Sequence, residues 1–179
     1  MAKLDEAANI GVGSRIALLG HPIHAMLVTF PIALVVATLG ADLMWWLLGD
    51  PFFARVGLWT SGWGFVLGVI AGLAGTAELL SGPGIRRRPE SWTHAVAAMM
   101  LLSVIGANWG LRLFDPQAAI LPWGMMLSLG GLVFVGLAGW QGGKLVFEHQ
   151  MGVMIAEEKD EPEAEDRPDL PGVARDPAR

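Results

Sequence analysis

Four histidines, together with Glu78 and Glu148, are the candidate side chains for binding a metal ion or relaying a proton. His21 and His24 stand in the stretch "GHPIHAMLVTFP", residues 20–31, at the mouth of a long apolar run. Neutral imidazole is the commonest metal ligand in proteins. The chain has no cysteine, which excludes disulfides and thiolate chemistry. The chemistry to consider is therefore that of imidazole nitrogens and carboxylate oxygens.

The elements that must position these residues are membrane spans. Hydrophobic residues make up 53% of the 179 residues and charged residues only 16%, a composition typical of membrane proteins. A spanning helix needs about 20 mostly apolar residues. Four stretches qualify, at about 22–48, 55–80, 92–114 and 121–147, and short loops containing Gly, Pro and Asp separate them. The sequence predicts an all-α fold, an integral membrane four-helix bundle over residues 20–153.

The two ends of the chain differ from this central domain. Residues 1–19 form an N-terminal segment of mixed character, and we expect residues 4–19 to lie on the membrane surface as a short amphipathic helix. Residues 154–179 form a Pro-rich acidic tail that is too poor in apolar residues to order itself. Nine acidic and four basic residues between Glu157 and Arg179 account for the whole net charge of −5. The sequence has no basic patch of the kind that would indicate nucleic acid as a partner.

The distribution of Lys and Arg predicts the direction of the spans. With four crossings, both termini and the middle loop share one side, and that side carries most of the basic residues: Lys3, Arg15, Arg86, Arg87, Arg88 and Lys144. The other side carries only Arg55 and Arg112. An excess of Lys and Arg marks the cytoplasmic side. We therefore expect a multi-pass protein of the bacterial inner membrane with both termini in the cytoplasm, and a first span that is retained as an anchor.

Because the chain crosses the membrane four times, the candidate ligands all lie at one level of the membrane. His21 and His24 open the first span, Glu78 closes the second, His94 opens the third, and Glu148 and His149 close the fourth. Helical bundles build metal and cofactor sites from side chains on facing helices. The four histidines are candidate axial ligands of a b-type haem, with His94 paired with His24 or His149. His21, His24, Glu78 and His94 are candidate ligands of another transition metal.

Each of these polar groups can instead have a structural or interfacial role. A histidine at a helix end can lie among lipid headgroups or cap its helix, and His21 before Pro22 has the form of a helix start. Asp42, near the other end of the first span, is expected to be a structural polar group bonded to Thr60 or Asn108. Arg86 to Arg88 are expected to fix topology and to contact anionic headgroups.

Two further patterns concern packing. Small residues recur along one face of the second span, at Gly57, Ser61, Gly64, Gly68, Ala71 and Gly75, and on the fourth span at Gly136, Gly139 and Gly143. Small residues let helix backbones approach closely in lipid, although such a face can also leave a slot for a planar cofactor. Pro31 is expected to kink the first helix and to free a carbonyl near residue 27.

The motifs also resemble a known family. "GHPIHAMLVTFPIALVVATLGADL" resembles the opening His-Pro-x-His-Pro-x-x-Val-x-Phe-Pro pattern of an uncharacterised bacterial membrane family, domain of unknown function 2231. "TAELL", "WTHAVAAMMLLSV" and "GWQGGKLVFEHQMGV" extend the resemblance, which covers about residues 16–153. Ala25 departs from the second His-Pro of the pattern. The resemblance implies a small four-helix protein, and the redox modules joined to some relatives imply redox membrane biology; no activity is established for the family.

Three hypotheses follow for function. The first is an inner-membrane protein that binds haem b or another transition metal at its cytoplasmic-side histidines and serves electron transfer. The second is a cofactor-free accessory subunit that packs against a larger membrane redox or respiratory complex, or against its own copies, through its glycine faces. The third is a proton or ion conductor that uses His24, Glu78 and His94 as relay groups. An ordinary hydrolase is not expected, because no nucleophile and base stand at a meaningful spacing.

Overall fold

The structure is a computed structural model, and it describes residues 16–19 and 21–149. A two-residue strand, β1 (Ala17–Leu18), pairs antiparallel with β2 (His21–Pro22). Helices follow in the order α2 (Ile23–Leu27), α3 (Thr29–Leu48), α4 (Pro51–Ser81), α5 (Pro83–Arg86) and α6 (Pro89–Arg112). A short π-helical segment, η1 (Ile120–Gly124), then leads into α7 (Met125–Phe147).

Within the part of the chain that the structure describes, four helical stretches are long and apolar enough to cross a membrane. They run over Ile23–Leu48, Pro51–Ser81, Pro89–Arg112 and Ile120–Phe147. They confirm the four predicted spans and the all-α membrane bundle. Residues 1–15 of the predicted N-terminal segment and the whole predicted acidic tail, 154–179, lie outside the described residues; residues 16–19 contain β1 and are not helical.

The second and third spans begin three or four residues earlier than predicted, because proline opens both helices. Pro51 follows Asp50, whose Oδ1 accepts a hydrogen bond of 2.8 Å from the Phe52 amide. Pro89 also opens a helix, α6, but the preceding residue, Arg88, makes no side-chain cap there. Proline suits the first helical position because its missing N–H would have no partner there and its fixed φ matches the helix. The sequence prediction treated these prolines as loop residues that stop a helix, and it therefore placed the starts of the second and third spans too late.

The first span is interrupted near its start, as predicted from Pro31. Helix α2 ends at Leu27, Val28 forms the junction, and α3 begins at Thr29. Proline has no N–H, so the carbonyl four residues before it, that of Leu27, loses its helical donor. Helix α2 packs on α4.

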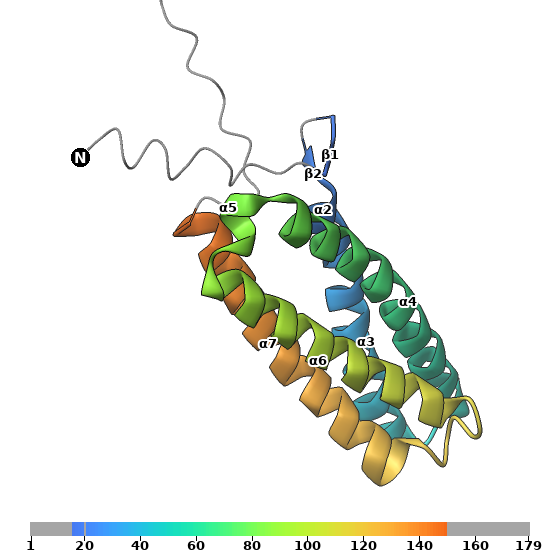
Figure 1. Cartoon of the computed structure of the whole chain (residues 1–179). Helices are drawn as coiled ribbons and strands as arrows, with labels where there is room; N and C mark the ends of the chain where they lie inside the picture. The colour runs from blue at the N-terminus through green and yellow to red at the C-terminus, as the bar shows by residue number, and fades with distance from the viewer. Residues whose placement is uncertain (1–15, 20, 150–179) are drawn as a thin grey trace, which may run out of the picture.

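The four long helical stretches pack around one another as a closed bundle, and Figure 1 shows this arrangement. Helix α3 packs on α4 and α7, and α6 packs on α4 and α7. The β1–β2 hairpin, α2 and α5 lie at one end, which we call the α5 end (Figure 1). The turn between α3 and α4 and the loop after α6 lie at the other, which we call the loop end (Figure 1).

The glycine face of α4 is covered within the chain. Gly57, Gly64 and Gly68 are buried, and a β-carbon at Gly68 would stand 2.7 Å from the Leu102 side chain of α6. This confirms the predicted close packing for the second span. The glycine face of α7 differs: Gly136 and Gly139 are exposed, and a β-carbon at either would meet nothing within 4 Å. That face of α7 points away from the bundle.

The bundle is apolar on its outside. Large side chains such as Trp46, Trp59 and Trp123 toward the loop end, and Trp92 and Trp140 toward the α5 end, are exposed. The interior contains instead a set of buried polar side chains: Thr38, Asp42, Ser61, Glu78, Ser91, Asn108, Arg112 and Ser128. A surface of this kind suits lipid, where apolar side chains face the acyl chains and polar ones face the bundle interior.

Candidate functional site: a histidine pair at the α5 end

His24 is held by the backbone of a neighbouring helix. It lies on α2, and its Nδ1 bonds to the carbonyl oxygen of Ala71 on α4 at 2.8 Å. The ring lies against Gly75, where a β-carbon would come within 2.7 Å of Nδ1. The glycine is therefore what allows the imidazole to lie against α4 and reach the carbonyl one turn away.

His94 is held in the same manner on the other side of the bundle. It lies on α6, and its Nδ1 bonds to the carbonyl oxygen of Ala138 on α7 at 3.1 Å. A glycine again stands beside the ring, because a β-carbon at Gly142 would lie 3.1 Å from its Cε1. Each histidine thus has a backbone carbonyl and a glycine on the helix that it leans against.

The two rings meet. Their centroids are 6.2 Å apart and their planes are inclined by 83°. A carbonyl oxygen only accepts hydrogen bonds, so each Nδ1 carries a proton, and in a neutral ring this leaves the lone pair on Nε2. Within the described residues, neither Nε2 has a hydrogen-bond partner. We call His24 and His94 the histidine pair.

Two further acceptors without partners lie on the helices that hold the rings. Glu78 is buried, at 9% exposure, and its Oε1 has no hydrogen-bond partner. It stands one turn beyond Gly75, on the α4 face that carries Ala71. On α7, Oε1 of Gln141, the residue before Gly142, is also buried without a partner. Gln141 did not enter the sequence prediction; its signal was a polar residue inside an apolar span beside two glycines.

The other predicted ligands lie elsewhere. His21 is exposed in β2, and its Nδ1 bonds to the carbonyl oxygen of Leu19 at 2.9 Å, so it does not begin a helix as expected. Nδ1 of His149 lies 3.3 Å from Nη1 of Arg88. Within residues 16–19 and 21–149, no group of three or more His, Asp or Glu side chains is close enough to hold a metal ion. Of the predicted ligand sets, the structure therefore brings together His24 and His94.

A second buried polar group lies toward the loop end. Asp42 Oδ2 accepts hydrogen bonds from Arg112 Nη2 at 2.7 Å and from Ser128 Oγ at 2.6 Å. Asn108 donates to Ser128 Oγ at 2.9 Å and accepts from Arg112 Nε at 3.0 Å. We call Asp42, Asn108, Arg112 and Ser128 the loop-end cluster.

The loop-end cluster gives Asp42 hydrogen-bond partners that differ from the expected ones. Neither Thr60 nor Asn108 bonds to Asp42 directly, and Thr60 bonds to Thr38 instead. Arg112 is not an exposed outer charge but is fully buried. The spacing of Asn108 and Arg112, four residues apart in α6, was the available signal that both point into the bundle.

The comparison with known families agrees with this architecture. Residues 20–154 match the family described as "Predicted membrane protein (DUF2231)". The chain belongs to this family. The match begins beside the histidine motif and extends past the end of α7, so it contains the whole bundle and both members of the histidine pair. No curated protein and no solved structure matches the chain.

Proposed function

We propose that this DUF2231 protein is an integral membrane protein that binds a transition metal through Nε2 of His24 and Nε2 of His94. The observation that carries the proposal is the shared arrangement of the two rings. Each Nδ1–H is fixed by a backbone carbonyl, which orients the ring and leaves Nε2 as the donor. Metal-ligating histidines are generally oriented in this way by a bond at their other nitrogen.

The separation of the rings suits a single metal between them. Metal–nitrogen bonds are about 2.0–2.1 Å and a ring nitrogen lies about 1.2 Å from its ring centre, so two imidazoles that shared one metal ion would have centroids no more than about 6.4 Å apart. The observed separation is 6.2 Å. The described residues contribute only these two ligands. A haem supplies four nitrogens of its own, so a site with two histidines would suit it better than a bare ion, and His24 and His94 would be the residues that hold it.

Electron transfer is the proposed role of such a centre. The haem supplies a reversible one-electron couple, and the chain's own residues would hold and orient it. Glu78 adds a buried carboxyl group at the same end of the bundle, and polar groups near a metal centre tune its potential. We also propose that the α5 end faces the cytoplasm of a bacterial cell. Arg86 and Arg87 are exposed at this end, and an excess of basic residues marks the cytoplasmic side. Its expected partner is a membrane redox or respiratory complex.

The test is an absorption spectrum and a metal analysis of the full chain purified in mild detergent. We expect a Soret band, or a stoichiometric metal if the centre is not haem. His24→Ala and His94→Ala should each abolish the signal, while His21→Ala, which alters an exposed histidine outside the pair, should retain it. A folded, colourless and metal-free protein would overturn the proposal.

One observation favours a second candidate, the cofactor-free accessory subunit. The glycines of α4 are covered by this chain, whereas Gly136 and Gly139 of α7 are open. An open glycine face lets another transmembrane helix approach closely, whether from a larger complex or from a second copy. A metal-free protein that co-purifies with a membrane complex, and loses it in Gly139→Leu, would support this candidate.

The third candidate, a proton conductor, is favoured by the unpartnered buried carboxylate of Glu78. Ionisable groups inside a membrane domain commonly mark proton or ion pathways. A proton flux in liposomes that Glu78→Gln abolishes would support it, in a protein that holds no metal.

A further inference from the structure

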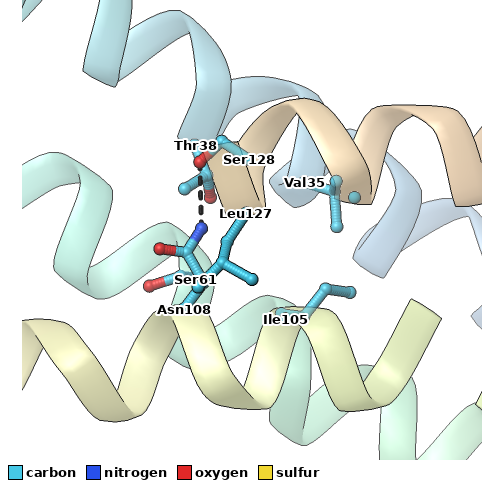
Figure 2. Close-up of a pocket in the computed structure, with 8 residues that line it drawn as sticks. Val35, Thr38, Ser61, Ile105, Asn108, Leu127 and Ser128 are labelled. Atoms are coloured by element: carbon cyan, nitrogen blue, oxygen red, sulfur yellow. Dashed lines mark hydrogen bonds between the residues drawn. The ribbon is translucent and has the colours of Figure 1, made fainter. Parts of the chain in front are cut away.

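A small cavity lies between the helices that carry the loop-end cluster (Figure 2). Its volume is about 10 Å³. Four polar side chains in its wall, all at most 3% exposed, are Thr38, Ser61, Asn108 and Ser128. A cavity needs about 10–15 Å³ to hold one water molecule, which also needs two to four polar partners. The volume and the wall together suit a single water.

The polar groups of the wall retain unused hydrogen-bonding capacity. The amide nitrogen of Asn108 carries two N–H groups, and one of them is directed to Ser128 Oγ (Figure 2). Ser61 gives its proton to the Gly57 carbonyl at 2.7 Å, which leaves lone pairs on its oxygen. Thr38 Oγ1 bonds to the Leu34 carbonyl and to Thr60. The wall therefore offers a donor from Asn108 and hydroxyl acceptors from Ser61 and Thr38.

We propose that this cavity is a binding site for one ordered water molecule, which accepts from Asn108 and donates to Ser61 and Thr38. Water both accepts and donates at one atom, and this matches the mixed wall. An ion suits the site less well, since Asp42 and Arg112 next to it already neutralise each other at 2.7 Å. The neighbouring Asp42 Oδ1 and Arg112 Nη1 are buried without partners, so this level of the bundle has more polar groups than protein contacts satisfy.

The site is confined to the loop-end half of the bundle. Between the cavity and the histidine pair, Gly68 packs against Leu102 and Pro31, which form an apolar layer. Water held at the cavity is therefore separated from the α5 end. The inference is independent of any metal at the histidine pair, and it predicts hydration on one side of that layer only.

The experiment is solid-state NMR of the full chain in lipid bilayers, measuring how fast magnetisation passes from water to assigned side chains. We expect the Asn108 side-chain amide to receive it several-fold faster than the Leu102 methyl groups. Gly131→Ala should abolish this fast transfer, because Gly131 lines the cavity and the new β-carbon would stand 3.3 Å from Val35, a contact that small shifts can accommodate.

The matched control is Gly130→Ala, in the preceding residue of the same helix. Its β-carbon would meet nothing closer than 3.9 Å and it does not line the cavity, so fast transfer to Asn108 should persist. If Gly131→Ala does not fold, the comparison of Asn108 with Leu102 in the unmodified protein decides. Transfer to Asn108 as slow as transfer to Leu102, or unchanged transfer in a folded Gly131→Ala protein, overturns the proposal.

Discussion

Arg112 donates to Asp42 across 70 residues of sequence, from Nη2 to Oδ2 at 2.7 Å, with both side chains fully buried. The ion pair joins the first and third spans, and Ser128 brings in the fourth. An unpaired charge inside a membrane bundle is costly, so each partner makes the burial of the other tolerable. The pair therefore defines how α3, α6 and α7 assemble at the loop end.

Removing one partner should destabilise the bundle strongly. We expect Arg112→Met to lower the free energy of unfolding by about 3–5 kcal/mol, because it leaves the Asp42 carboxylate buried without a cation. The measurement is reversible unfolding in mixed detergent micelles. Arg55→Met is the control, since Arg55 is exposed at the same end, and it should change stability by less than about 0.5 kcal/mol.

The double variant Asp42→Leu/Arg112→Met tests the pairing itself. It should cost clearly less than the sum of the two single variants, because neither charge is then left alone. Additive losses would show that the two side chains do not depend on each other.

The glycine beside this pair should be intolerant of a side chain. A β-carbon at Gly57 would stand 2.6 Å from Arg112 Nη1 and 3.4 Å from Asp42 Oδ1. We expect Gly57→Ala to cost about 1–3 kcal/mol, the usual range for overpacking a filled interior. Gly136→Ala, the same change where nothing lies within 4 Å, should leave stability unchanged or raise it slightly. Equal effects of the two variants on unfolding would contradict the observed packing.

The common level of His24 and His94 was predictable because it depends on topology alone. Antiparallel spans joined by short loops bring the starts of the first and third spans to the same end of the bundle, but which rings meet there also depends on the rotation of each helix. His21 was misjudged because its local structure depends on a hairpin: residues 17–18 pair with 21–22, and α2 starts only at Ile23. Each strand has only two residues, which is too short to show the alternation of apolar and polar residues that predicts a strand.

The loop-end cluster was harder to predict because it depends on helix rotation. Arg112 stands at the last position of α6, where a charged residue is ordinarily expected to face water or headgroups. Only the position of Arg112 around the axis of α6, on the same face as Asn108, shows that its side chain points into the bundle and not toward the headgroups. Gln141 was overlooked for the same reason, since the phase of α7 decides whether its amide points toward lipid or inward.

The orientation of the bundle can be tested because the chain has no cysteine of its own. We expect Gln117→Cys, in the exposed loop after α6, to react with a membrane-impermeant maleimide in intact bacterial cells. Glu90→Cys, exposed at the start of α6 near the three arginines, should react only after the membrane is permeabilised. The reverse pattern would place the α5 end outside the cell and would contradict the cytoplasmic histidine site.

Gly75 offers a test of the metal proposal that leaves both histidines in place. A β-carbon there would come within 2.7 Å of His24 Nδ1, so the ring must turn away and release the Ala71 carbonyl. Losing the group that orients a ligating histidine typically weakens metal binding about 10- to 100-fold. We expect Gly75→Ala to lower metal affinity by this factor, measured by competition with a chelator and, for haem, by loss of the Soret band. Gly139→Ala, an equal change on the open face of α7, should retain full binding. If Gly75→Ala binds as tightly as the unmodified protein, the orientation of His24 against α4 is not what creates the site.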